Sequence, residues 1–120
     1  RAIKDILMDQ KFVSGIGNIY ANEILFLSKI KPFRKVKSLK EFEIKKIVKF
    51  TKKVLKKAIK LGGSSIKDFS SSNGKKGSFQ QHFSVYGKKG DPCPNNRCKS
   101  KIIKHSISNR SSFFCSKCQK

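Results

Sequence analysis

The sequence predicts a mainly α-helical protein that ends in a small β-hairpin held together by cysteines. Three observations lead to this fold class. Residues 3–61 carry apolar side chains at the three- and four-residue steps of helices, residues 62–83 are rich in glycine and serine, and residues 84–120 hold turn residues, short β-like runs and all four cysteines. A chain of 120 residues is long enough for two small domains, and we expect them at 1–83 and 84–120.

Three helices are expected in the first of these domains. The first covers residues 3–8, and the second starts with Asn18 as its N-cap and ends at Lys31-Pro32. The third opens with a capping box at residues 38–41 and stops at Gly62-Gly63.

The third helix is amphipathic. Lysines cover the faces that its apolar side chains leave free, and we interpret this lysine surface as solvated, because it supplies charge but no side chain that could read a base. The apolar stripe expected to face the core consists of Leu39, Phe42, Ile47, Val48, Val54, Leu55, Ala58 and Ile59.

Short β-like runs predict the second domain. Residues 83–86 alternate as an edge strand, and residues 102–103 and 112–114 are expected to form a hairpin whose turn lies at 108–110. The loop from Ser64 to Ser78 is long for a simple connection, which indicates either a functional loop or a disordered linker.

The composition indicates a polyanionic partner. Lys and Arg number 29 against seven Asp and Glu, which gives a formal net charge of +22. Nucleic acid is the favoured partner and an anionic membrane surface is the main alternative, while part of the charge reflects a composition with 25 lysines and only four arginines. The charge excludes an acidic calcium-binding protein, and no apolar run reaches the roughly 18 residues of a membrane-spanning helix.

The four cysteines form two close pairs that are separated by sixteen residues. Such spacing is typical of a tetrahedral four-thiolate zinc site, whereas two disulfides, the alternative, would suit a secreted mini-protein. Since four thiolates fill a tetrahedral site, His82 and His105 are expected to be structural. We therefore predict one structural zinc ion bound by Cys93, Cys98, Cys115 and Cys118.

An ordered series of short motifs runs through nearly the whole chain. It consists of Leu7-Met8-Asp9-Gln10, GIGNIYANE from Gly15, GGSSIKDF from Gly62, Asn73-Gly74, GSFQ from Gly77, Val85-Tyr86-Gly87, GDPC from Gly90, Arg110-Ser111-Ser112 and CSKCQ from Cys115. In this series the chain resembles the C-terminal half of the formamidopyrimidine-DNA glycosylases, bacterial base-excision enzymes. The resemblance implies a helix–two-turn–helix domain over 1–83 and a zinc-finger β-hairpin over 84–120.

The resemblance also implies an activity for the whole protein. Members of this family flip 8-oxoguanine or formamidopyrimidines out of duplex DNA, remove them and cleave the abasic site through a Schiff base; the motifs resemble this branch more than the endonuclease VIII branch. The family's catalytic proline amine, glutamate and lysine lie in an N-terminal domain, and none of the 120 residues matches them. Since the chain begins at Arg1 rather than at methionine, we interpret it as a fragment or processed product, inactive by itself. A stand-alone zinc-dependent DNA-binding module is the alternative.

The resemblance implies DNA contacts for four side chains. Asn18 matches an asparagine that binds the phosphate beside the extruded nucleotide, at a helix start that attracts anions. Lys4 matches a lysine near the same phosphates, and Tyr86 a tyrosine whose hydroxyl reaches a phosphate. Arg110 matches an arginine whose planar fork grips the phosphates flanking the lesion. The alternatives are a plain N-cap for Asn18, simple solvation for Lys4 and aromatic packing for Tyr86.

The resemblance makes segment 63–79 the loop that folds over the flipped base, where a disordered linker is the alternative. Two departures from the family pattern, the four-residue spacing of the first cysteine pair and Lys99 in place of a glycine, both leave the zinc site possible. The expected partner is damaged double-stranded DNA, bound by a monomer without obligate protein partner or membrane, in the bacterial cytoplasm at the nucleoid. The candidate contacts of the loop are Ser64, Ser65, Ile66, Lys67 and Phe79.

Overall fold

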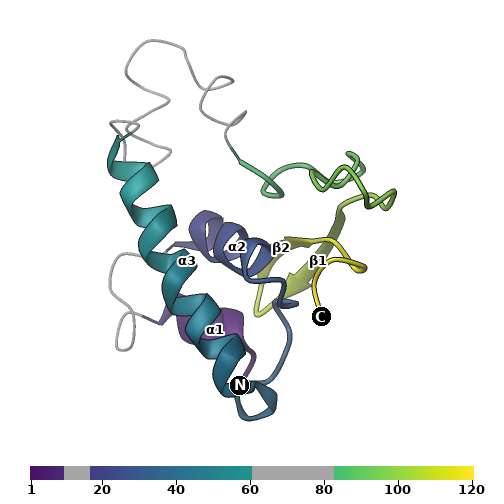
Figure 1. Ribbon diagram of the computed structural model, residues 1–120. Helices are drawn as coiled ribbons and strands as arrows, with labels where there is room; N and C mark the ends of the chain where they lie inside the picture. Colours follow the sequence, from purple (N-terminus) through teal and green to yellow (C-terminus); the bar gives the residue numbers. More distant parts are fainter. Residues whose placement is uncertain (10–16, 61–82) are drawn as a thin grey trace.

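The computed structural model describes residues 1–9, 17–60 and 83–120, and in these ranges three α-helices are followed by a two-stranded antiparallel hairpin (Figure 1). This order confirms the predicted fold class. The loop 63–79, the stop at Gly62-Gly63 and His82 lie outside the described residues. The elements are α1 (Ile3–Met8), α2 (Asn18–Leu27), the 3-10 helix η1 (Val36–Ser38), α3 (Glu41–Lys60), β1 (Ile103–Ile107) and β2 (Arg110–Phe114).

The helices share one apolar core, and α2 lies at its centre (Figure 1). The side chains of Ile24 and Leu25 on α2 are fully buried, and Ile47 of α3 packs against the same cluster. Each contributes about 1.5–3 kcal/mol through removal of its apolar surface from water. The buried members of this cluster are Ile3, Leu7, Ala21, Ile24, Leu25, Ile30, Ile47 and Val54.

Both ends of α2 differ from the prediction. Asn18 is the first helical residue, Gly17 stands at the N-cap, and no side chain caps the helix there. The helix ends at Leu27 rather than at Lys31-Pro32, because Lys29 turns the chain with a φ of 62°. This left-handed residue lets Ile30 N–H donate to the Leu25 carbonyl and Lys29 N–H to the Phe26 carbonyl, which is a Schellman motif.

The start of α3 corrects the predicted capping box at residues 38–41. The Ser38 hydroxyl instead donates to the carbonyl of Lys35, inside η1. The glutamate that binds back to the helix start is Glu43. Its carboxylate accepts hydrogen bonds from the Lys40 N–H at 2.9 Å and from both terminal nitrogens of Arg34 at 3.2 Å. The hydrogen bond from Arg34, then that from the Lys40 backbone, holds the pKa of Glu43 below its ordinary value of 4.5.

The apolar stripe of α3 is narrower than predicted. Ile47 and Val54, seven residues apart, are buried on one face, whereas Phe42 is 59% and Val48 50% exposed. The side chains of residues 58–60 are not described. Because α1 and α2 cover only one side of α3, apolar residues off that side remain in solvent.

The hairpin has its own small core. Strands β1 and β2 are antiparallel, and Ile103 pairs with Phe114 at one end and Ile107 with Arg110 at the other. Ser108 and Asn109 form the two-residue turn between them, with φ of 51° and 63°, as in a type I′ turn. Arg110 therefore begins β2 instead of belonging to the turn. Val85, Cys93, Ile102, Phe113 and Cys115 form the buried cluster, with Phe26 of α2 packed against it.

Residues 83–86 form turns rather than the predicted edge strand, since the backbone N–H groups of residues 84–86 bind a side chain of α2. Among the described residues, no helix is long and apolar enough to cross a membrane.

Replacing Glu43 with glutamine should lower the free energy of unfolding by about 1 kcal/mol at neutral pH, because the charged bonds to Arg34 and Lys40 weaken. A lowered pKa stabilises the fold above the ordinary glutamate value and loses this effect as pH falls through the lowered pKa. Urea unfolding followed by helical circular dichroism should therefore show a smaller difference between E43Q and wild type at acid pH. Glu41→Gln, whose pair with Lys45 is exposed, is the control and should change little. An equal deficit of E43Q at acid and neutral pH would contradict this account.

Candidate nucleic-acid interface and metal centre

The backbone carbonyl of Ser111, on strand β2, is the meeting point of three side chains from the helices. It accepts hydrogen bonds from Lys4 Nζ at 2.9 Å, Asn18 Nδ2 at 3.1 Å and, at the limit of length, Asn22 Nδ2 at 3.4 Å. Lys4 Nζ also donates to the Ser112 hydroxyl at 2.7 Å. These contacts join α1, α2 and the hairpin more than 85 residues apart in the chain.

Lys4 is only 1% exposed, so the alternative interpretation of Lys4 as a solvated lysine is wrong. Burial lowers the pKa of its amine to about 8, with Asp5 opposing this shift and Arg110 adding to it. Its two acceptors are neutral oxygens, so a positive charge on Lys4 is incompletely compensated. An anion placed beside Lys4 and Arg110 would stabilise the charged amine.

Asn18 opens α2 and turns its amide toward the hairpin. Its Nδ2 donates to Ser111, whereas its Oδ1 is buried and accepts no hydrogen bond in the described part of the chain. The first N–H groups of a helix lack intrahelical acceptors and carry the positive end of its dipole. The amide and the helix start together form a donor-rich corner next to Lys4.

Arg110 completes this corner from the hairpin side. It is exposed at the start of β2, one residue before Ser111, and its charge acts on Lys4. The hairpin turn is tied to α1 because the Ser108 hydroxyl donates to Asp5 at 3.1 Å. The structure thus brings together Lys4, Asn18 and Arg110, three of the four side chains predicted to contact DNA.

Tyr86, the fourth, lies in the aromatic part of the finger core. Its ring packs edge-on against Phe113 at 5.1 Å and Phe83 at 5.9 Å between centroids. The residue is half-buried, so the ring packs as the alternative interpretation expected. Packing of the ring fixes the direction of its hydroxyl.

Two residues of α2 that the sequence interpretation missed attach the finger to the helices. Glu23 accepts the backbone N–H groups of Ser84, Val85 and Tyr86, the last two at 2.9 and 3.0 Å. Asn22 accepts the Phe113 N–H at 2.7 Å and donates to the Asn18 carbonyl at 2.8 Å. Both residues are buried.

A sequence signal for these residues exists. Ile19, Asn22, Glu23 and Phe26 stand at helical spacing on the side of α2 away from Ile24 and Leu25. Polar residues at core spacing on a second face indicate a helix that is covered on both sides. That pattern could have identified them.

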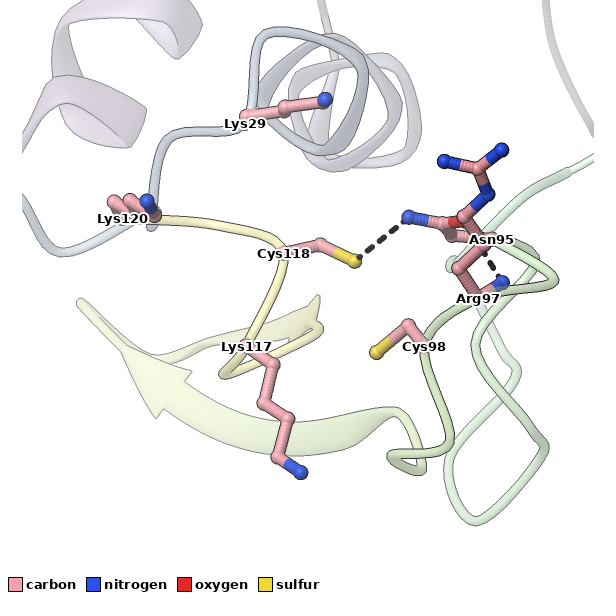
Figure 2. A pocket seen from close by; sticks show the side chains of 7 residues that line it. All are labelled: Lys29, Asn95, Arg97, Cys98, Lys117, Cys118 and Lys120. Carbon is pink, nitrogen blue, oxygen red and sulfur yellow. Dashed lines mark hydrogen bonds between the residues drawn. The ribbon is translucent and has the colours of Figure 1, made fainter.

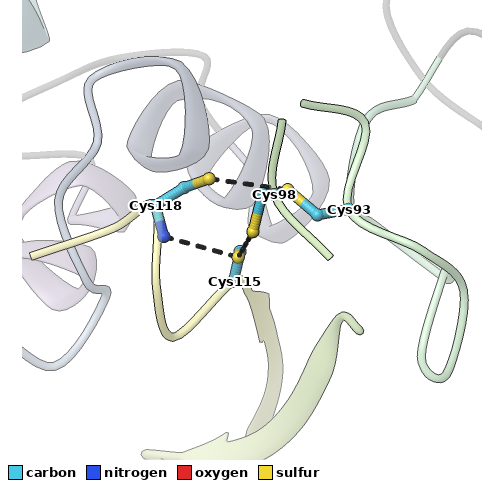
Figure 3. A group of neighbouring side chains, drawn as sticks. All are labelled: Cys93, Cys98, Cys115 and Cys118. Atoms are coloured by element: carbon cyan, nitrogen blue, oxygen red, sulfur yellow. Dashed lines mark hydrogen bonds between the residues drawn. The ribbon is translucent and has the colours of Figure 1, made fainter. Parts of the chain in front are cut away.

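The four cysteines gather at one point, as predicted (Figure 3). All four Sγ atoms lie within 4.8 Å of one another, with Cys93–Cys118 at 3.6 Å and Cys98–Cys115 at 3.5 Å. These separations exceed the roughly 2.05 Å of a disulfide, so the disulfide alternative does not hold. They approach the ~3.8 Å edge of a tetrahedron with Zn–S bonds of about 2.3 Å.

The chemistry of the donor set also fits a metal. Burial raises the pKa of Cys93 to about 12, whereas hydrogen bonding from the Ser100 backbone lowers the pKa of Cys98 to about 7. A bound cation would hold all four as thiolates. His105 lies in β1, as expected of a strand residue, with its ring against Phe114, and it does not belong to the cysteine cluster.

Gln119, also missed from the sequence, anchors the second cysteine pair to the end of α2. Its Oε1 accepts the Cys115 N–H at 2.8 Å, and its Nε2 donates to the Ile30 carbonyl at 2.9 Å. The residue is fully buried, and its neighbour Lys120 donates its N–H to Lys29. The cysteine cluster is thereby fixed to the helical core.

A shallow pocket with basic side chains borders the cysteine cluster (Figure 2). Asn95 donates to Cys118 Sγ at 3.5 Å across it, while the side chain of Lys117 points away from the two sulfur atoms drawn. Its lining is Lys29, Asn95, Arg97, Cys98, Lys117, Cys118 and Lys120.

Three packed helices followed by a hairpin with four clustered cysteines define a helix–two-turn–helix domain with a zinc-finger-like extension. The family model described as the formamidopyrimidine-DNA glycosylase H2TH domain matches residues 1–70, and the chain belongs to this family.

Curated relatives support the same conclusion. The chain is 46% identical over 120 residues to the formamidopyrimidine-DNA glycosylase of Neisseria meningitidis, and 47% identical over 118 residues to that of Vibrio vulnificus. The first comparison covers all of this chain and the second covers 98% of it, whereas each covers only 43% of the relative. The chain therefore spans less than half the length of these relatives.

Solved structures agree in fold. The Lactococcus lactis protein in complex with abasic-site DNA matches with a TM-score of 0.85 and 40% identity, over all of this chain and 42% of that one. A MutM protein in complex with DNA that contains carbocyclic 8-oxo-G matches with a TM-score of 0.83 and 39% identity, over all of this chain and 41% of that one.

Substituting Asn22 with alanine should leave the buried Phe113 N–H unpaired and cost about 1–3 kcal/mol. The hairpin should loosen from α2, and amide hydrogen exchange should accelerate in β2 more than in α3. Asn96→Ala, at an exposed site of the finger, is the matched control. Unchanged exchange in β2 would show that Asn22 does not connect the two parts.

Proposed function

We propose that this chain is the DNA-binding, C-terminal part of a formamidopyrimidine-DNA glycosylase and abasic-site lyase that acts on oxidised purines in duplex DNA. The observation that carries this proposal is that Lys4 and Asn18 meet at the Ser111 carbonyl next to Arg110, whose charge acts on Lys4. An incompletely compensated buried cation, a helix start and an arginine in one place favour a phosphate. Relatives bound to abasic-site DNA and 8-oxo-G DNA support it.

Each side chain has a proposed part in binding. Asn18 and the start of α2 donate to the phosphate beside the flipped nucleotide, and the Lys4 ammonium lies behind it. Arg110 holds the flanking phosphates through its fork, and the hydroxyl of Tyr86 reaches a further phosphate. To accept a phosphate, the amide of Asn18 shares or exchanges its bond to Ser111.

The base-covering role belongs to segment 63–79, with Ser64, Ser65, Ile66, Lys67 and Phe79. Flipping a base out of the stack costs a few kcal/mol, and a loop that closes over the base offsets part of that cost. These residues lie outside the described part of the structure, so their role follows from the family alone.

The four cysteines are proposed to bind one structural zinc ion, since their chemistry and separations suit it. A zinc ion supplies the cross-link that fixes the base of the hairpin, and hence Arg110. The proposed domains remain 1–83 and 84–120, although Glu23 and Asn22 bind the second domain closely to the first.

The chemistry itself is proposed for the longer protein. There, residues outside this chain form a Schiff base with the sugar and cleave the strand, while this part holds the DNA as a monomer in the bacterial cytoplasm. We expect the 120-residue chain to give no covalent adduct with abasic DNA under borohydride. An adduct would refute this division of labour, whereas a native product of only this chain would favour the stand-alone zinc-dependent DNA-binding module.

Binding to a duplex that carries an abasic-site analogue tests the proposal. With about four to seven phosphate contacts, log Kd against log salt should change with a magnitude of about 4–6. Asn18→Ala and Arg110→Ala should each weaken binding at least about tenfold, and Arg110→Ala, which removes a positive charge, should also reduce the salt slope by about 1. Arg97→Ala, which removes an exposed arginine beside the metal centre, is the control and should bind within about twofold. Equal affinity of R110A and R97A for the duplex would contradict the proposed interface.

Removal of the metal provides a further test. The finger buries little apolar surface, so chelation should loosen residues 90–120 while α1, α2 and α3 stay largely folded. Hydrogen exchange with and without chelator should show this division, and one equivalent of zinc should be released. Uniform loss of helix on chelation would contradict it.

A further inference from the structure

The outer face of α3 carries a dense row of lysines that the proposed site does not use. Between Lys45 and Lys57 there are seven lysines and no acidic residue. The acidic residues of the helix stand in its first turn, where Glu43 is engaged by Arg34. The lysines are Lys45, Lys46, Lys49, Lys52, Lys53, Lys56 and Lys57.

This row faces away from the Lys4–Asn18–Arg110 corner. Ile47 and Val54 attach α3 to α2, whose other side binds the hairpin, so α3 and the hairpin lie on opposite sides of α2 (Figure 1). Lys49, Lys53 and Lys56 follow at four and three residues, on the side of α3 opposite the buried stripe. One straight duplex at the corner would not reach them.

The row is unfavourable for the helix by itself. Lysines at i and i+4, such as 45/49, 49/53 and 53/57, repel each other by a few tenths of a kcal/mol per pair. The helix dipole favours cations only in the last turn and does not account for Lys45 to Lys53. Among the described residues, the lone ion pair of these lysines is the exposed one between Lys45 and Glu41 at 3.4 Å. Charge from outside the chain would relieve this repulsion.

Several of the ammonium groups are held over aromatic rings. Lys46 lies 5.6 Å from the centroid of Phe42, and Lys49 and Lys53 lie 5.5 and 5.8 Å from that of Phe50. Such contacts restrain long side chains and leave their charge unneutralised. The row is therefore a partly ordered strip of positive charge.

The length and charge of the strip match a DNA backbone. Twelve helical steps at about 1.5 Å span roughly 18 Å, over which a duplex carries about ten phosphate charges. An anionic membrane fits less well, because membrane-bound helices insert a broad apolar face. Here Ile47 and Val54 are buried in the core, and the exposed Ile44 and Val48 form only a narrow patch beside them.

We propose that the lysine strip of α3 is a second, sequence-independent surface for duplex DNA, so that the chain holds two duplex segments at once. This surface does not depend on the proposed glycosylase function. It would keep the protein on DNA while the corner around Ser111 releases one segment and engages another.

The proposal is tested by measuring whether DNA-bound protein captures a second duplex. The 120-residue chain is bound to a tethered duplex with an abasic-site analogue, and a fluorescent undamaged duplex is added. Wild type should capture it, and Lys49→Gln/Lys53→Gln/Lys56→Gln should lose capture at least about tenfold while it binds the tethered duplex within about twofold. The control Lys37→Gln/Lys99→Gln/Lys101→Gln removes the same charge from exposed sites elsewhere and should keep both activities. Circular dichroism checks that both variants retain their helices.

Two further measurements separate this proposal from the proposed function. A chain with Asn18→Ala and Arg110→Ala should still bind undamaged duplex through α3. Adding the three α3 substitutions should weaken that residual binding at least about tenfold and make its salt slope smaller by about 2.7. Second-duplex capture by the α3 variant at the wild-type level would overturn the proposal. Binding through the same lysines to phosphatidylglycerol vesicles in preference to duplex would overturn it as well.

Discussion

The junction between α2 and strand β2 is the contact on which the rest of the structure depends. Two separate apolar clusters exist, one among the helices and one in the finger, and α2 contributes to both through Ile24 and Phe26. Between them, the Phe113 N–H donates a buried hydrogen bond to Asn22 Oδ1, and Asn22 Nδ2 donates to the Ser111 carbonyl. An unpaired buried polar group costs more than its bond gains, so only one placement of the hairpin satisfies these groups. Specific polar contacts, rather than apolar area, set the position of Arg110.

The cysteine cluster acts on the same junction from the other end. Cys115 follows β2 directly, and Gln119 connects it to the carbonyl of Ile30 at the end of α2. The hairpin is thus held at its base by the sulfur cluster and Gln119, and at its tip by Ser108 on Asp5. A short two-stranded hairpin is marginally stable in water by itself. Fixing it at both ends lets it present Arg110 in a defined position.

The order of elements and the clustering of the cysteines could be predicted from the sequence because their signals are local. Helical spacing gave the bounds of α1, and cysteine spacing gave the sulfur cluster that the structure confirms. The end of α2 could not be predicted, since its left-handed residue is Lys29 rather than glycine. The predicted capping box at residues 38–41 was wrong because contact with Arg34 positions Glu43, and not Glu41, to accept the backbone N–H of Lys40.

The site was predictable in part for the same reason. Family motifs pointed to Lys4, Asn18 and Arg110, and their proximity required the fold. Asn22 and Glu23 were missed because their backbone partners are remote in sequence, and the sequence signals only the second polar face of α2 and not what covers it. Gln119 was missed because its bond to the Ile30 carbonyl likewise depends on the fold. Turns at 83–86 replaced the predicted strand because Glu23 takes the N–H groups that a strand partner would need.

Charge alone does not distinguish the two kinds of lysine in this chain. Lys4 is buried, and its pKa falls to about 8, so an anion that binds there stabilises a charged amine that burial disfavours. The lysines of α3 keep their water and act through their number and spacing, which makes their attraction long-ranged and sensitive to salt. A buried amine defines a position for one phosphate, whereas an exposed row accepts any phosphate along a backbone. The net charge of +22 therefore includes buried and exposed lysines, and burial assigns Lys4 to the proposed phosphate site and the lysines of α3 to the proposed strip.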